Sequence, residues 1–290
     1  MANSFKITSI DILNKVIEEY KDIQIDFDDN KYIFVGKNND FTVTIYRNYT
    51  VFFQGINAQE ELHKWINPEP IVFEHMGSDE VGCGDYFGPI VVCACYIQEK
   101  DYEELNKLGV KDSKQLTDKQ IKEIAPTLIK KIPHASFILS NTKYNEIRKE
   151  NYNLNKVKAY LHNFVLNKLA KKYNFSGKIV IDQFCPEDTY YKYLEDYNEE
   201  ILHGITFETK AENKYLAVAC GSIIARYLFL NEMEKLSLKI NRTIPLGANT
   251  TVDEFAFELA KEIGMDKMNE FVKLHFKNTN TLLDKIKNST

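Results

Sequence analysis

The sequence predicts a two-domain protein of the α+β or α/β class. Apolar, β-branched runs typical of strands alternate with amphipathic helix patterns along its 290 residues. Between two such stretches lies Asn67-Pro68-Glu69-Pro70, whose two prolines stop a helix and favour extended chain. We therefore expect one domain over residues 1–66, a linker over 67–72 and a second domain over 73–290.

The N-terminal domain is predicted to contain two helices and three strands. A helical pattern follows Ser9 over residues 10–20, and strand patterns cover 32–35, 41–46 and 50–53. A short helix is expected over 60–66. Residues 1–65 carry 7 basic and 10 acidic side chains. Contact with a polyanion would therefore have to use selected lysines and polar or aromatic side chains.

The most informative stretch of the second domain is residues 77–89. Its adjacent acids, Asp79 and Glu80, follow the apolar residues 71–73 and precede Gly82-Cys83-Gly84 and a predicted buried strand over 90–97. An unpaired buried carboxylate costs several kcal/mol, so these acids should be exposed, paired or bound to metal. Glycine lets the backbone approach a ligand closely. The pattern indicates a divalent-metal site beside a phosphate-bearing substrate.

Two other interpretations of this stretch are possible. A dinucleotide-binding fingerprint needs Gly-x-Gly-x-x-Gly opening a helix, whereas here the third glycine, Gly88, comes one residue late and a strand follows. A tight hairpin carrying a solvated Asp–Glu pair also fits these residues.

Two further acids lie where such a site would need them. Asp182 ends a β-branched strand pattern over 178–182, and Glu212 begins a long helical pattern. A strand-terminal Asp can be a turn former, and a Glu at a helix start can favour the helix dipole. Neither explanation accounts for three acidic elements in one chain.

Taken together, these motifs resemble those of the type 2 ribonucleases H. The resemblance covers about residue 73 to the C-terminus. It is carried by Asp79-Glu80-Val81-Gly82-Cys83-Gly84-Asp85-Tyr86-Phe87-Gly88-Pro89, Lys111-Asp112-Ser113-Lys114-Gln115-Leu116, Val180-Ile181-Asp182-Gln183-Phe184, Lys210-Ala211-Glu212-Asn213-Lys214 and Ser222-Ile223-Ile224-Ala225-Arg226. The ribonuclease HIII branch, rather than HII, is indicated by Asp85-Tyr86-Phe87-Gly88-Pro89, by Glu212 in place of Asp, by Ile244-Pro245-Leu246-Gly247-Ala248, by Lys273-Leu274-His275-Phe276 and by the extra N-terminal domain.

The resemblance implies both a fold and a reaction. The fold is a ribonuclease H-like mixed sheet flanked by helices, with an N-terminal α+β domain similar to the TATA-box-binding protein fold that grips the substrate. The reaction is endonucleolytic cleavage of the RNA strand of an RNA/DNA hybrid, which leaves 5′-phosphate and 3′-hydroxyl ends. Asp79, Glu80, Asp182 and Glu212 are implied to hold two Mg²⁺ or Mn²⁺ ions. Because adjacent strand residues point to opposite faces, Asp79 and Glu80 converge only if their strand bends.

Substrate contacts are expected from three segments. The candidates are Gly82, Cys83, Gly84, Asp112, Ser113, Lys114, Lys210 and Lys214. The glycine backbone can approach ribose 2′-hydroxyls, and the lysines can meet phosphate. Ser113 could instead cap a helix, and Lys210 and Lys214 could balance local acids. Cys83 stands where ribonuclease HII typically has a basic residue, which favours hybrids with several ribonucleotides.

Two other functions remain open from the sequence. One is incision at single ribonucleotides in DNA, as in ribonuclease HII, and the other is a catalytically silent protein that binds hybrids. A duplex with one embedded ribonucleotide tests the first, and hybrid cleavage with Mg²⁺ or Mn²⁺ tests the second.

Charge and composition are consistent with a nucleic-acid enzyme. The net charge is −5, yet residues 107–178 contain 16 Lys or Arg against 5 Asp or Glu. This basic segment could meet a polyanion, or it could be the solvated face of a helix over 154–169 with its lysines outward. Five cysteines without framework spacing favour reduced thiols in the cytoplasm, with Cys93 and Cys95 packed in a core. We expect a monomer with no membrane span and structural histidines such as His162.

Overall fold

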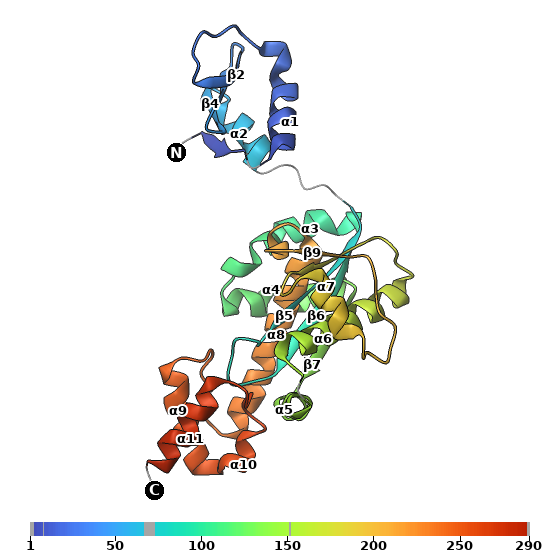
Figure 1. The fold of residues 1–290 in the computed structure, drawn as a ribbon, viewed down its shortest axis with the longest axis vertical. Helices are drawn as coiled ribbons and strands as arrows, with labels where there is room; N and C mark the ends of the chain where they lie inside the picture. The colour runs from blue at the N-terminus through green and yellow to red at the C-terminus, as the bar shows by residue number, and fades with distance from the viewer. Residues whose placement is uncertain (1–2, 8, 67–72, 151, 289–290) are drawn as a thin grey trace. The chain divides into compact units, whose positions relative to one another are not determined.

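The computed structural model describes residues 3–7, 9–66, 73–150 and 152–288, apart from the side chains of residues 111 and 112. Its contacts divide the chain into two compact units, Met1–Val72 and Phe73–Thr290 (Figure 1). The linker predicted over 67–72 and the apolar residues 71–72 lie outside the described residues.

The N-terminal unit is a four-stranded antiparallel sheet with two helices. Its strands run in the order β1-β4-β3-β2. The elements are β1 (Ser4–Lys6), α1 (Ile10–Tyr20), the 3₁₀ turn η1 (Lys21–Ile23), β2 (Tyr32–Lys37), β3 (Phe41–Tyr46), β4 (Thr50–Gly55) and α2 (Ala58–Ile66). The two helices and three strands predicted from the sequence are confirmed, while β1 is an additional edge strand.

The two faces of this sheet differ in character. Along β3, Phe41, Val43 and Ile45 are buried and pack with side chains of α1 and α2. The alternate residues of β3 are only partly buried, and Thr44 pairs with Phe52 of β4. Because strand side chains alternate between faces, the helices cover one face and leave a polar and aromatic face opposite.

The second unit is built on a five-stranded mixed sheet. The strand order is β7-β6-β5-β8-β9, in which β5, β6 and β7 are antiparallel and β8 and β9 run parallel to β5. The strands are β5 (His75–Val81), β6 (Ile90–Ile97), β7 (His134–Leu139), β8 (Lys178–Asp182) and β9 (Ile205–Glu208). The two acids expected at a strand–turn junction therefore lie inside β5, near its end.

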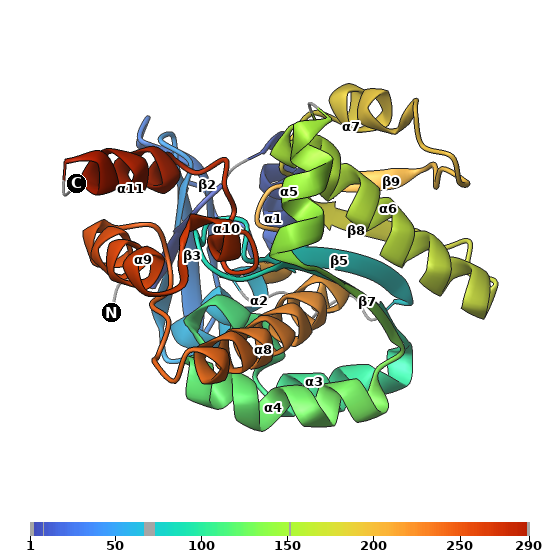
Figure 2. The same cartoon turned by 90° about the horizontal axis from the view of Figure 1, so that it is seen from below.

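Helices cover both faces of this sheet (Figure 2). They are α3 (Tyr102–Lys107), α4 (Asp118–Lys131), α5 (Asn141–Lys149), α6 (Leu154–Tyr173), α7 (Glu187–Leu194), α8 (Leu216–Lys239), α9 (Thr250–Ile263), α10 (Met265–Met268) and α11 (Lys277–Lys287), with 3₁₀ turns η2 (Glu99–Asp101), η3 (Val110–Gln115) and η4 (Ala211–Asn213). Along β6, Cys93 and Cys95 face the cluster containing α8, whereas Val92 and Ala94 face the cluster containing α6. The burial expected for the two cysteines is confirmed.

Side-chain caps explain where many of the helices begin. Thr117 and Gln120 form a reciprocal capping box at α4. Ser140 and Asn153 accept hydrogen bonds from backbone N–H groups in the first turns of α5 and α6. At α8 the corresponding acceptor comes from the sheet, since His75 Nε2 accepts from Ala217 N at 3.1 Å. This bond ties the start of α8 to β5.

Helix α8 lies unusually close to the sheet. A Cβ at Gly221 would stand 2.7 Å from the carbonyl oxygen of Cys93, and one at Gly77 would stand 2.6 Å from Val218. Such approach requires glycine at both positions. Helix α8 is long and apolar enough to cross a membrane by composition alone, but 67% of its most apolar window is buried within this unit. It is therefore a core helix of the second unit.

Candidate active site

Four acids gather at one end of the mixed sheet. Strands β5 and β8 are parallel, so their carboxyl ends, which carry Asp79, Glu80 and Asp182, meet at the same edge. Asp182 Oδ1 accepts a hydrogen bond of 3.0 Å from Ala211 N, which joins β8 to the turn η4. Glu212 is the next residue of that turn. The tertiary fold thus brings together side chains that are up to 133 positions apart in the sequence.

Asp79 lies on the face of β5 that α8 covers. Its side chain is 8% exposed and forms a hydrogen bond with Ser222 of α8, and Oδ1 accepts from Glu80 N at 2.8 Å. Burial, followed by the negative charges of Glu80 and Asp182, raises the pKa of the Asp79 carboxyl to about 7. A buried acid with like-charged neighbours is stabilised by any cation that enters the site.

Glu80 points to the opposite face of β5, where it contacts side chains of α6. His162 Nε2 donates to Glu80 Oε2 at 2.9 Å, and Lys158 is ion-paired with Glu80 Oε1. Burial raises the pKa of Glu80, but the His162 hydrogen bond and the charges of His162 and Lys158 outweigh it and lower that pKa to about 2. The solvated Asp–Glu hairpin is excluded, because both carboxylates are enclosed by protein.

The bend on which convergence of Asp79 and Glu80 was expected to depend is absent, so the two carboxylates do not meet as the side chains lie. Strand β5 pairs with β6 in unbroken register from His75 to Val81, so Asp79 and Glu80 keep their alternate directions. The prediction that the lysines of α6 point outward is wrong for Lys158, which is 8% exposed. It lies 4.0 Å above the Phe184 ring, and its contact with a carboxylate and an aromatic face compensates its burial.

Glu212 has the least satisfied carboxylate of the site. It is 1% exposed, and among the described residues neither carboxylate oxygen has a hydrogen bond of suitable geometry, although Lys114 is ion-paired with Oε1. Burial and the charge of Glu212 raise the pKa of neighbouring Asp182, against the opposing effect of the Ala211 hydrogen bond. A buried carboxylate with so few donors offers oxygen ligands to a hard cation.

The donor set therefore fits a divalent metal ion in its chemistry, since it consists of carboxylate oxygens. Across residues 3–7, 9–66, 73–150 and 152–288, no three carboxylate, imidazole or thiol groups stand close enough to share one ion as the side chains lie. Two ammonium groups explain part of this separation, because Lys114 and Lys158 engage Glu212 and Glu80. A shared ion would need these side chains to rearrange, including release of Glu212 by Lys114.

The glycine-rich turn follows β5 directly. Gly82 has φ +93°, and a Cβ there would lie 2.2 Å from the carbonyl oxygen of Pro89, so its glycine is required by the fold. At Gly84 a Cβ would meet nothing within 4 Å and the backbone is ordinary, so the fold does not explain this glycine. Asp85 Oδ1 accepts from Gly247 N at 2.6 Å, which holds the turn against the 244–248 segment.

A cavity of about 340 Å³ adjoins the acids between η3, α4 and α8. Ser113 and Lys114 line it together with Ser222 and Arg226, which the sequence analysis did not assign to substrate. The buried Ser113 hydroxyl has no hydrogen-bond partner among the described side chains, and Thr117 rather than Ser113 caps α4. Asp118 holds the Arg226 guanidinium through hydrogen bonds of 3.0 and 3.3 Å. The four-residue spacing of Ser222 and Arg226, which puts both on one helix face, is the signal that could have identified them.

The other predicted contacts have different surroundings. Lys214 is ion-paired with Glu208, as the alternative of a local charge balance expects. Lys210 has a left-handed backbone, φ 55°, immediately before η4. Asp112 belongs to η3, but its side chain lies outside the described residues. Cys83 is partly buried between its two glycines, and burial raises its thiol pKa to about 12, so it is a neutral thiol.

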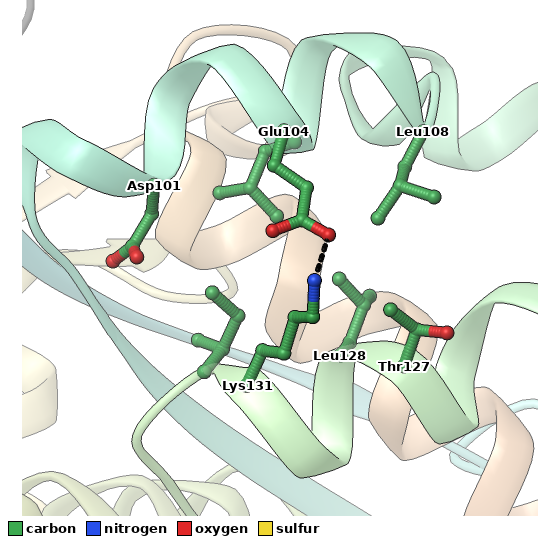
Figure 3. A pocket seen from close by; sticks show the side chains of 8 residues that line it. Asp101, Glu104, Leu108, Thr127, Leu128 and Lys131 are labelled. Atoms are coloured by element: carbon green, nitrogen blue, oxygen red, sulfur yellow. Dashed lines mark hydrogen bonds and ion pairs between the residues drawn. The ribbon is translucent and has the colours of Figure 1, made fainter.

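Two cavities away from the acids show no comparable chemistry. One, of about 20 Å³, lies between α3 and α4 around the Glu104–Lys131 ion pair and holds little more than a water molecule (Figure 3). The other, of about 220 Å³, is an apolar hollow between β7, α5 and α6. Neither brings several acids or cations together.

Comparison with known proteins is consistent with this geometry. The model of the ribonuclease HII family matches residues 76–279, and that of a domain of unknown function, DUF3378, matches residues 6–72. A fold and a carboxylate site of this kind define a type 2 ribonuclease H.

Full-length relatives narrow the assignment. Ribonuclease HIII of a Geobacillus species is 41% identical over 85% of this chain and 86% of its own, and that of Bacillus mycoides is 39% identical over 96% and 97%. The crystal structure of Bst-RNase HIII in complex with Mn²⁺ aligns with a TM-score of 0.76 at 36% identity, covering 98% of this chain and 99% of that one. Aquifex aeolicus RNase H3 aligns with a TM-score of 0.59 at 25% identity, covering 94% and 100%.

The chain belongs to the ribonuclease HIII family. It is an endoribonuclease, a hydrolase that cuts the RNA strand of RNA/DNA hybrids, and the family implies a divalent metal cofactor. The expected fold class is confirmed, including the N-terminal α+β domain, which is TATA-box-binding-protein-like in this family.

Proposed function

We propose that Asp79, Glu80, Asp182 and Glu212 hold two divalent ions, Mg²⁺ or Mn²⁺, and that cleavage at this site leaves 5′-phosphate and 3′-hydroxyl ends. The observation that supports this most directly is the buried Glu212 carboxylate, whose Oε1 contacts Lys114 and whose oxygens accept no hydrogen bond of suitable geometry from the described residues, together with the raised pKa of the Asp79 carboxyl. Bound there, the ions activate water and neutralise charge on the leaving oxygen in an in-line displacement. No histidine relay is required.

The chain's own residues then bind and orient the substrate. Lys114 releases Glu212 and becomes available to a phosphate of the RNA strand, and the unpaired Ser113 hydroxyl donates to a neighbouring phosphate oxygen. The backbone of Gly82, Cys83 and Gly84 approaches the ribose 2′-hydroxyls, the groups that distinguish RNA from DNA. The unobstructed space around Gly84 supports this role. We also assign Asp112, Lys210 and Lys214 to contacts with the RNA strand. Lys214 would first have to leave its ion pair with Glu208.

The N-terminal domain, residues 1–66, binds the hybrid through the sheet face that its helices leave uncovered. Thr44 and Phe52 pair across that face, and Lys37 and Lys6 are exposed at strand ends. Removal of residues 1–72 should therefore leave the cleavage chemistry intact and raise KM by about 100-fold, since a tethered module adds uniform binding. Steady-state kinetics of the full chain and of a chain starting at Phe73 on one long hybrid measure this. An unchanged KM would remove the N-terminal domain from substrate binding.

The cellular setting follows from the same assignment. We place the enzyme in the cytoplasm, because its five cysteines are unpaired and four of them are buried. Thiols of this kind suit a reducing compartment. We also propose that it acts as a monomer.

The function is tested with matched duplexes of one sequence: RNA/DNA, RNA/RNA and DNA carrying one ribonucleotide. We expect cleavage of the hybrid alone, with Mg²⁺ or Mn²⁺, and products that carry 5′-phosphates. Efficient incision at the single ribonucleotide would favour the ribonuclease HII-like alternative. Hybrid binding without cleavage under any metal condition would contradict the proposal.

A further inference from the structure

Both oxygens of the Glu80 carboxylate are occupied by side chains of one helix. Lys158 is ion-paired with Oε1 and His162 donates to Oε2, and these two residues stand one turn apart on α6. The carboxylate of Asp79, by contrast, accepts hydrogen bonds from a backbone N–H group and a serine hydroxyl. Glu80 is therefore the carboxylate whose direction is fixed most completely by protein.

The histidine is itself held in one orientation. An ionised carboxylate only accepts, so Nε2 of His162 carries a hydrogen, and Nδ1 of the same ring is hydrogen-bonded to Ser78 Oγ at 2.7 Å. Both ring nitrogens thus bind side chains of β5, two residues apart. His162 is fully buried, and its ring stacks on Phe184 with centroids 5.4 Å apart. Contacts on both nitrogens and on one ring face thus hold the imidazole in this orientation.

Stability alone gives little reason for this arrangement. Buried ion pairs contribute weakly to folding, and apolar side chains of similar volume frequently replace them without loss. A buried histidine that orients a carboxylate at a metal site, however, has a known kind of effect: loss of such outer partners typically weakens metal affinity by 10- to 100-fold. The position of the pair next to an acid cluster therefore favours a role in the site.

We propose that His162 is a positioning residue that holds Oε2 of the Glu80 carboxylate in place for metal binding, and that Lys158 covers Oε1 until an ion displaces it. The inference rests on the proposed function, in which Glu80 belongs to the metal-binding set. The two residues act differently on Glu80, which separates their effects. Loss of the His162 donor frees Glu80 to rotate, whereas loss of the Lys158 cation removes a competitor for Glu80.

The test measures Mn²⁺ binding to the full chain by calorimetry, with no substrate present. His162→Leu should weaken Mn²⁺ binding by about 10- to 100-fold, and His162→Gln, whose amide can donate where Nε2 does, should remain within about threefold of the parent chain. Lys158→Met should bind Mn²⁺ at least as tightly as the parent chain but turn over more slowly at saturating hybrid. Lys156→Met is the matched control, since Lys156 lies on the same helix, pairs with Asp196 and sits 4.4 Å above the Tyr152 ring.

Melting curves and hybrid KM separate positioning from folding. We expect kcat to fall with Mn²⁺ affinity in His162→Leu while KM for the hybrid stays the same. If the leucine variant does not fold, His162→Asn replaces it, because asparagine can reach Ser78 but not Glu80; the glutamine variant should then bind Mn²⁺ about 10-fold more tightly than the asparagine variant. Parent-like Mn²⁺ affinity in folded His162→Leu, or equal affinities of the glutamine and asparagine variants, would overturn the proposal. A parent chain that binds Mn²⁺ but cuts no hybrid would instead count against the proposed function.

Discussion

Asp79 and Glu80 are adjacent in the chain, yet their carboxyl groups have opposite properties. Asp79 faces α8, where burial raises its pKa to about 7, while Glu80 faces α6, where His162 and Lys158 outweigh burial and lower its pKa to about 2. Strand alternation alone separates them, because β5 is regular through both residues. The face on which a carboxylate lies, and therefore which helix provides its neighbours, determines the direction in which its pKa shifts.

The difference between the two faces has a chemical consequence. The α8 face gathers uncompensated acids, since Val180 of β8 packs with Val218 of α8 and Asp182, two residues on, points the same way. The α6 face supplies the cations that compensate Glu80. A cation entering the site therefore gains most from the α8 face, whereas the α6 face presents an acid that is already ionised and oriented.

The largest expected effect separates the two acids by mutation. Asp79→Asn and Glu80→Gln should each reduce hybrid cleavage by roughly a thousandfold or more. Their stabilities should move in opposite directions: Asp79→Asn relieves like-charge repulsion, whereas Glu80→Gln leaves Lys158 buried without its counter-charge at a cost of about 3–5 kcal/mol. Single-turnover cleavage and chemical denaturation measure the two quantities. Equal stability changes in the two variants would contradict the opposite properties inferred for Asp79 and Glu80.

Stability as a function of pH tests the same opposition without substrate. Because the folded pKa of Asp79 lies above its unfolded value, protonated Asp79 favours folding, and this contribution is lost as pH rises from about 4 through 7. Glu80 acts with the opposite sign, and its contribution is lost as pH falls from about 4.5 towards 2. Relative to the parent chain, Asp79→Asn should therefore gain about 2 kcal/mol more at pH 8 than at pH 5 in metal-free buffer. A gain that does not depend on pH would contradict the raised pKa.

A glycine pair tests where substrate approaches the end of β5. Gly84→Ala should leave the free energy of unfolding unchanged, since a Cβ meets nothing there, and should raise KM for the hybrid by about 10-fold if a ribose comes close. Gly82→Ala is the structural counterpart. The positive φ of Gly82 and the nearby carbonyl of Pro89 should make this variant less stable to unfolding by several kcal/mol. An unaltered KM in Gly84→Ala would place the substrate elsewhere.

The smallest effect concerns the lysine on the α8 side. Lys114→Met removes the cation that engages Glu212, so Mn²⁺ should bind the substrate-free chain about fivefold more tightly. Hybrid affinity should fall over the same range, because a phosphate contact is lost. Lys119→Met, on the exposed surface of neighbouring α4, serves as the control. Weaker Mn²⁺ binding in Lys114→Met would show that this lysine supports the metal site rather than competing with it.

Much of this architecture could be predicted from the sequence because it depends on local patterns. Strand and helix periodicities identified most elements, and the acids were recognised from motifs whose residues are contiguous. The inward direction of Lys158 could not be predicted, since a helical pattern shows an apolar stripe but not a carboxylate contributed by a strand 78 positions earlier. For the same reason His162 was expected to be merely structural. The unbroken register of β5 could not be predicted, because the glycines that follow the strand are also compatible with a bend.

We infer that the acid cluster is a metal site responsible for hybrid cleavage, and a single titration can test this inference. Mn²⁺ is added to the metal-free full chain, and ion binding and the rate of RNA/DNA cleavage are recorded on the same samples, with Asp79→Asn alongside. We predict no cleavage in chelator, a rate that rises in parallel with Mn²⁺ occupancy in the parent chain, and loss of both in Asp79→Asn. Cleavage in chelator, or full Mn²⁺ binding and cleavage by Asp79→Asn, would contradict the account.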